Sequence, residues 1–172
     1  FDTWKFQPDE YKKHFSVAMK DPLKAWILWF LIHCQESPEK LAEVGLHWKL
    51  PKKWIQAAVY CLQSLTQLRN ILNIEAVDLA IFLSKPNGRL AIEVYQALHQ
   101  GRVKEHFYDK SEAADVFFEK GELPALLVNG DDLLVYGVPP APEIARQMKR
   151  LYRMQLQEKI SQKEDLMKRI KL

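Results

Sequence analysis

The positions of the prolines constrain most strongly how this chain of 172 residues can fold. Asp21-Pro22 and Ser37-Pro38 each place a capping side chain before a proline, an arrangement with which many helices begin. Pro51 stands at the start of a third such stretch. Apolar residues recur every three or four positions after each of these sites, as they do on one face of a helix. The pattern predicts an all-α fold, with an irregular multi-helix body followed by a smaller helical tail.

Helices are predicted along most of the chain. Residues 22–32 are apolar on all sides, which is typical of a central, buried helix. Residues 123–136 contain an Asn-Gly turn signal that is consistent with a small hairpin. A loop with one helical turn, capped by Asp131 or Asp132, is the favoured prediction there. The expected helices are 8–19, 22–32, 38–46, 51–68, 74–83, 89–99, 111–119, 142–159 and a last one that a Ser161–Glu164 capping box opens.

The composition suits a globular protein, with 48% hydrophobic and 27% charged residues. A chain of this length can bury roughly 70% of its unfolded surface. Turn signals divide it into a helical body, residues 1–105, and a helical tail, residues 106–172, with residues 121–124 as an alternative boundary. The apolar run 25–32 is far too short to cross a bilayer, so we expect no membrane partner. Because the chain begins at Phe1, we expect it to be a piece of a longer protein.

The residue types used in catalysis do not form a recognisable pattern. Cys34 and Cys61 lie within apolar helical stretches and are predicted to be buried free thiols in a reducing, cytoplasmic compartment. The histidines are scattered, so no metal site is expected. Neither a glycine-rich phosphate loop nor a Gly-x-Ser-x-Gly motif is present. The sequence therefore predicts no catalytic residue in this chain.

Positive charge gathers at the C-terminal end. The net charge is +3, but residues 141–172 hold nine Lys or Arg against four Asp or Glu. Four of these cations follow the proline-rich residues 137–142 at helical spacing and share one helix face, which is either a solvated face or a contact with the phosphates of a partner. They are Arg146, Lys149, Arg150 and Arg153.

A second cationic stretch lies at residues 48–54, where three lysines lie between two aromatic residues. Trp48 and Trp54 flank Lys49, Lys52 and Lys53. Aromatic rings beside cations can stack on bases or sugars of RNA. The alternative is that the tryptophans pack a junction between helices while the lysines remain solvated. The three lysines are candidate RNA-binding residues.

Residues 127–144 resemble a signature of bacterial tRNA nucleotidyltransferases, the class II CCA-adding enzymes with their A-adding, CC-adding and poly(A) polymerase relatives. Residues 26–51 are similar, more diffusely, to the helical body of that family. Ala141 and Ala145 stand where the family often has glycine. The residues that carry the signature are Asn129, Gly130, Asp132, Gly137, Pro139, Pro140 and Pro142.

The resemblance implies a non-catalytic C-terminal region that holds tRNA or another structured RNA. The family's head motif Gly-Gly-x-x-Arg-Asp, its Asp-x-Asp metal pair and its neck motif Glu-Asp-x-x-Arg are absent from the sequence. The resemblance therefore implies a catalytic head N-terminal to this chain, which uses Mg²⁺ and ATP or CTP, and no cofactor for the chain itself. Whether that protein adds CCA, A, CC or poly(A) stays open. The alternative hypothesis is a helical protein–protein module whose tryptophan-rich helices form a homodimer face.

Overall fold

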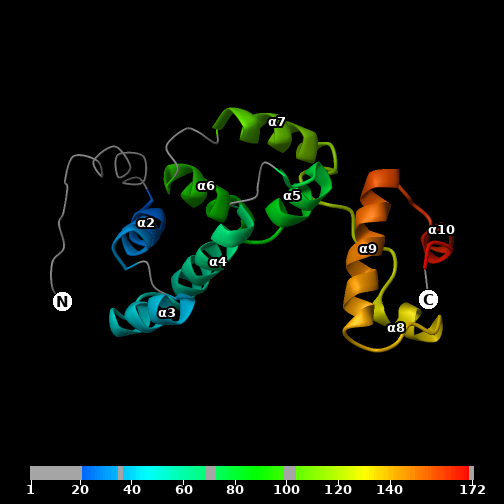
Figure 1. Ribbon diagram of the computed structural model, residues 1–172, viewed down its shortest axis with the longest axis horizontal. Helices are drawn as coiled ribbons and strands as arrows, with labels where there is room; N and C mark the ends of the chain where they lie inside the picture. The colour runs from blue at the N-terminus through cyan, green and yellow to red at the C-terminus, as the bar shows by residue number, and fades with distance from the viewer. Residues whose placement is uncertain (1–20, 35–36, 69–72, 99–103, 171–172) are drawn as a thin grey trace. The chain divides into compact units, whose positions relative to one another are not determined.

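The computed structural model describes residues 21–34, 37–68, 73–98 and 104–170. Within these ranges the secondary structure is helical, and an isolated bridge between Glu119 and Glu122 is the one extended pairing. The all-α prediction is confirmed (Figure 1). The helices are α2 (Pro22–Cys34), α3 (Pro38–His47), α4 (Lys52–Leu68), α5 (Ala76–Leu83), α6 (Gly88–Leu98), α7 (Lys104–Asp115), α8 (Gly130–Val135), α9 (Glu143–Glu158) and α10 (Lys163–Met167).

Capped starts occur where the Asp-Pro and Ser-Pro pairs predict them. The Asp21 carboxylate accepts the Leu23 N–H at 3.0 Å, and the Ser37 hydroxyl accepts the Lys40 N–H at 3.3 Å. These bonds satisfy amides that have no partner within the first helical turn. The helix predicted for residues 8–19 lies outside the described residues.

Three local predictions are wrong. The seventh helix begins at Lys104 rather than at residue 111 and ends at Asp115. The last helix begins at Lys163 after the N-cap residue Gln162, which makes no side-chain cap bond, so Ser161 does not form the predicted capping box. In the segment 123–136 the helical turn forms as predicted, but its N-cap residue is Asn129, while Asp132 completes a capping box from the third helical position and Asp131 takes no part in it.

The chain divides into two compact units, with the first comprising Phe1–Asn73 and Lys85–Tyr108 and the second Ile74–Ser84 and Asp109–Leu172. Helix α5 therefore belongs to the second unit although it interrupts the first in sequence. The predicted boundary between residues 105 and 106 stays a prediction.

In the first unit, α4 packs against α3, α6 and α2 (Figure 1). Its apolar stripe includes Ile55, Ala58 and Cys61, all buried. Helices α3 and α4 approach closely at Gly45, where an added Cβ atom would lie 2.8 Å from Ile55 Cγ1. This close approach fixes the corner at which α3 ends and α4 begins.

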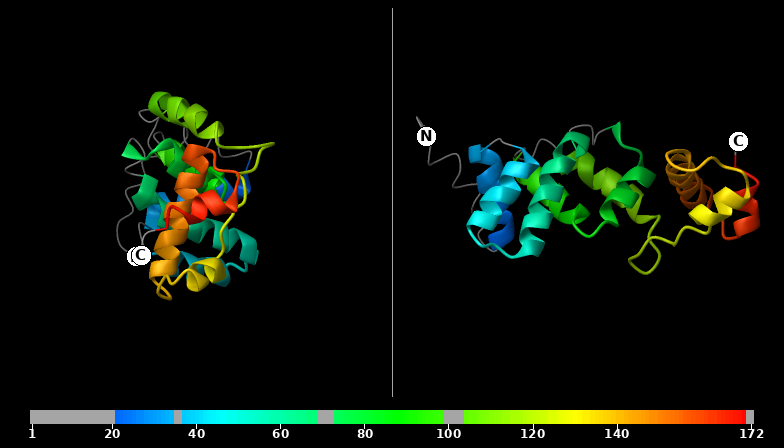
Figure 2. Two further views of the ribbon diagram at one scale, coloured as in Figure 1. Left: turned by 90° about the vertical axis from the view of Figure 1, so that its right-hand side faces the viewer. Right: turned by 90° about the horizontal axis from the view of Figure 1, so that it is seen from below.

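In the second unit, α9 contacts α5, α8 and α10. Figure 1 and the right-hand view of Figure 2 place α8 and α10 on the same side of α9. The core on that side is apolar and consists of Val128, Leu133, Val138, Leu151, Leu166 and Ile170. None of the helices in the described ranges has the length and apolar character needed to cross a membrane.

Candidate nucleic-acid interface

The proline-rich elbow, residues 137–142, is anchored by the way α8 ends. Gly137 has a φ of 97°, a left-handed conformation that glycine adopts without a Cβ clash. The Val138 N–H donates to the Leu133 carbonyl at 2.9 Å and the Gly137 N–H to the Leu134 carbonyl at 3.0 Å. This pair of bonds is the Schellman motif, and the buried side chains of Val138 and Leu133 complete it. The motif sets the direction in which the chain leaves α8.

The start of α8 is fixed by reciprocal hydrogen bonds between Asn129 and Asp132. The Asp132 N–H donates to Asn129 Oδ1 and the Asn129 N–H to Asp132 Oδ2, both at 2.9 Å. Lys163 Nζ lies 2.6 Å from the other carboxylate oxygen, Oδ1. The Asn129 N–H and then the Lys163 ammonium hold the pKa of the Asp132 carboxyl below its usual range. Asp132 therefore links α8 to the segment that opens α10.

The proline-rich elbow connects α8 to α9. Pro139 and Pro140 are exposed, the Ala141–Pro142 bond is cis, and α9 begins at Glu143. A Cβ atom on Gly130 would lie 3.7 Å from Ile144 Cγ2, an ordinary contact, so Gly130 lies close to the first turn of α9. The signature residues thus act together as the support that holds the N-terminal end of α9.

Two of the four cations predicted on α9 are open to solvent. The side chain of Arg146 is 73% exposed and pairs at 2.6 Å with Glu143, one turn earlier. Lys149 is also exposed. A solvent-exposed ion pair contributes at most about 1 kcal/mol, so Arg146 can exchange Glu143 for another anion at small cost.

The other two cations make contacts within the second unit. Arg150 donates to the Gln147 side chain at 3.1 Å and to the Arg169 carbonyl at 3.0 Å. Arg153, 31% exposed, lies 2.7 Å from a Glu75 oxygen and 3.4 Å from an Asp78 oxygen. Arg153 therefore ties α9 to α5.

Sequence reasoning missed the buried glutamines of α9. Gln155 is 4% exposed, and its amide donates to the Ala125 carbonyl at 2.8 Å while its oxygen accepts the Leu127 N–H at 2.9 Å. The signal was available in the sequence, because Gln147, Leu151 and Gln155 recur every four residues along one face. The glutamine holds the segment before α8 against α9.

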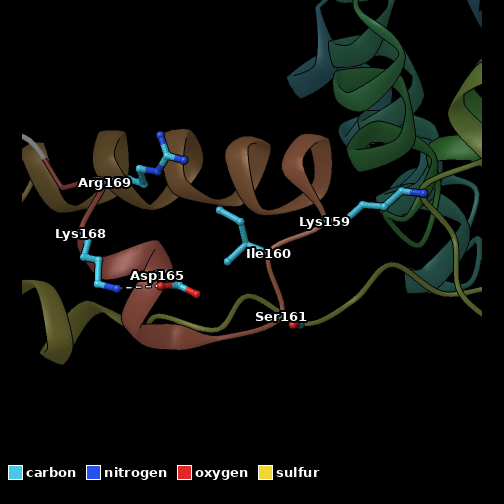
Figure 3. A pocket seen from close by; sticks show the side chains of 6 residues that line it. All are labelled: Lys159, Ile160, Ser161, Asp165, Lys168 and Arg169. Atoms are coloured by element: carbon cyan, nitrogen blue, oxygen red, sulfur yellow. Dashed lines mark hydrogen bonds and ion pairs between the residues drawn. The ribbon is translucent and has the colours of Figure 1, made fainter.

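Three further cations, Lys159, Lys168 and Arg169, line a cavity of about 420 Å³ at the C-terminal end of α9. Lys168 pairs with Asp165 at 2.8 Å and Arg169 with Glu158 at 2.9 Å. Figure 3 shows Lys159 extending away from the other two. These cations are spread along the surface and do not converge on one ligand.

In the first unit, the lysines predicted from residues 48–54 are exposed, namely Lys49, Lys52 and Lys53. Trp48 beside them is 50% exposed, and its ring centroid lies 5.4 Å from that of Trp29. Trp54 is partly buried. The structure thus brings the three lysines together with one accessible ring.

In the part of the chain that the structure describes, no three His, Cys, Asp or Glu side chains form a group that could hold a metal ion. Cys61 is a buried free thiol as predicted, and burial raises its pKa to about 12, so it is not a nucleophile at neutral pH. The side chain of Cys34 lies outside the described residues.

An all-α fold with a proline elbow that aims a cationic helix defines a helical domain with an exposed basic surface. A family model described as tRNA nucleotidyltransferase domain 2 matches residues 19–170. The chain therefore belongs to the tRNA nucleotidyltransferase domain 2 family, and the family resemblance predicted from residues 127–144 is confirmed. Comparison with curated proteins and with solved structures gives no match.

Proposed function

We propose that this chain holds tRNA by its phosphate backbone and positions the RNA 3′ end for a nucleotidyltransferase head that precedes it. The observation that supports the proposal is the exposed pair Arg146 and Lys149 on α9, in a chain of this family. Contacts to phosphates fix orientation without reading sequence, and folded RNA is recognised largely by shape. Mg²⁺ and ATP or CTP belong to the head in this proposal, and the chain supplies no catalytic group.

The four predicted cations divide into two roles. Arg146 and Lys149 contact the RNA, whereas Arg150 and Arg153 orient α9 through their bonds to the Arg169 carbonyl and to the carboxylates of Glu75 and Asp78. Any contact of Arg153 with RNA requires it to release two carboxylates.

The test is the salt dependence of tRNA binding by the double variant Arg146→Gln, Lys149→Gln. Each phosphate contact that is lost decreases the slope of log affinity against log salt by about 0.7 to 0.9. We expect the slope to decrease by about 1 to 2 and the affinity at low salt to fall. Lys85→Gln with Lys120→Gln is the matched control, because it removes the same charge from exposed positions on other elements.

An affinity and a slope equal to those of the wild type contradict the proposal, and so does an equal loss in the control. Circular dichroism of both variants checks that the helices are retained. Arg153→Gln should lower stability as well as affinity, which distinguishes the structural role of Arg153 from the direct role of Lys149.

A further inference from the structure

The corner between α3 and α4, residues 46–53, exposes apolar side chains that a helical junction normally buries. Leu46 is 69% exposed and Trp48 is 50% exposed. One side of the Trp48 ring meets Trp29, with the two ring planes 38° apart. Despite this contact, half of the Trp48 surface remains exposed to solvent. We call residues 46–53 the tryptophan corner.

The tryptophan corner is positively charged without local compensation. Lys49, Lys52 and Lys53 are exposed, and none of them makes an ion pair within the described ranges. No Asp or Glu occurs in the sequence between Glu43 and Glu75. Lys52 and Lys53 also occupy the first turn of α4, which holds no acidic residue, although the helix dipole disfavours cations there.

The corner is preformed by backbone contacts. Lys49 has a φ of 54°, and the Leu50 N–H donates to the Gly45 carbonyl at 2.9 Å, which closes α3 with a tight turn. The close approach of Gly45 to Ile55 holds the two helices together on the inner side. A ligand therefore meets a ring and three cations whose backbone positions are already set.

The charge distribution selects between two kinds of occupant. A second copy of this chain, bound through a two-fold axis, would bring three lysines from each copy against one another around the tryptophans. Like charges brought together at an interface oppose association. A single-stranded stretch of RNA supplies a base to stack on the ring and phosphates to neutralise the lysines.

We propose that the tryptophan corner binds an unpaired nucleotide of the RNA, whose base stacks on Trp48 while neighbouring phosphates contact Lys49, Lys52 and Lys53. The proposal rests on the proposed function in taking RNA as the partner. It differs in the residues used, which lie in the first unit, and in requiring an unpaired base.

The test uses the full chain with two probes at low salt, an eight-nucleotide oligoadenylate and a blunt RNA duplex. We expect Trp48→Leu to weaken oligoadenylate binding by about 5- to 100-fold, the range that loss of one stacked base gives. Duplex binding should stay at the wild-type value. Trp48→Phe should restore much of the lost affinity, because it restores an aromatic face.

A variant of reversed charge separates loss of binding from loss of folding. Lys52→Glu with Lys53→Glu should weaken binding of both probes and yet raise the midpoint of urea unfolding, because acidic residues suit the first turn of α4. A lower midpoint, or unchanged binding of both probes, would overturn the assignment of these lysines.

Wild-type affinity of Trp48→Leu for oligoadenylate overturns the proposal, as does a wild-type dimer in light scattering that Trp48→Leu converts to a monomer. Loss of oligoadenylate binding in Trp48→Leu supports it even if Arg146→Gln, Lys149→Gln binds tRNA normally. In that case the proposed RNA contact of Arg146 and Lys149 is contradicted, while the proposed RNA contact of the tryptophan corner is supported.

Discussion

At the level of single residues, Lys159 shows how a side chain can be kept in an unfavourable backbone conformation. It ends α9 with a φ of 50° and a ψ of 43°, and the Ile160 N–H donates to the Gln155 carbonyl at 3.0 Å. The left-handed region costs a residue with a Cβ atom about 1 kcal/mol of conformational energy, whereas glycine adopts it without that cost. Lys159 also lines the cationic cavity at the end of α9, so charge is retained where glycine would fit the backbone better.

We therefore expect Lys159→Gly to raise the free energy of unfolding by about 0.5 to 1 kcal/mol. The same replacement inside the helix, Lys149→Gly, should lower the free energy of unfolding by about 1 kcal/mol because glycine is a poor helix former. Urea unfolding of the two variants measures the difference in sign. A loss of stability in both variants contradicts the argument.

The hydrogen bonds of Asp132 predict how the stability of the protein depends on pH. Its folded pKa is lowered, so its contribution to stability is present at neutral pH and is lost as the pH falls through the carboxyl range. We expect the wild type to lose stability on acidification more steeply than Asp132→Asn. Urea unfolding between neutral pH and about pH 3 measures this. Parallel pH profiles for the two proteins would contradict the role given to Asn129 and Lys163.

The sequence predicts which cations share the α9 face but not which of them are free. Helical spacing alone places Arg146, Lys149, Arg150 and Arg153 together. The pairing of Arg153 with Glu75 joins residues 78 positions apart, and no local pattern predicts such a contact. The N-cap of α8 is Asn129 rather than an aspartate for a related reason, because three polar residues within four positions offer similar caps and local pattern does not select among them.

At the level of elements, Gln155 fastens residues 125–127 to α9 through both ends of its amide. Gln155→Leu keeps the volume but leaves the Leu127 N–H and the Ala125 carbonyl without these bonds. We expect the free energy of unfolding to fall by about 2 kcal/mol. Gln157→Leu on the exposed side of the same helix removes one solvent-exposed hydrogen bond, to Glu75, and should change the free energy of unfolding by about 0.5 kcal/mol or less. Equal effects of the two variants in urea unfolding would contradict the role of Gln155 in holding residues 125–127 against α9.

Helix starts that a proline marks are predicted well, whereas the start predicted from the Ser161–Glu164 capping box and the start of α7 are not. Pro22 and Pro38 mark starts that the structure confirms, because proline and its preceding cap act within one turn. Helix α7 has no such signal and begins seven residues before the predicted position. Apolar periodicity does not locate the start of such a short polar segment.

At the level of the whole molecule, the two cationic surfaces proposed to contact RNA belong to different compact units, the tryptophan corner to the first and the first turns of α9 to the second. The net charge of +3 does not reveal either cationic surface. Counting charged residues segment by segment along the sequence locates both. The sequence does not reveal that α5 belongs to the second unit, because that depends on contacts such as Arg153 with Asp78.

If one tRNA contacts both places, the effects of removing them should add. We expect Arg146→Gln, Lys149→Gln combined with Lys52→Gln, Lys53→Gln to decrease the salt slope by the sum of the two separate changes, about 3 in total for four lost phosphate contacts. Filter binding of tRNA over a series of salt concentrations measures the slopes. If one of the two pairs of substitutions leaves the slope unchanged, both alone and combined with the other pair, the RNA contacts only the unit that carries the other pair.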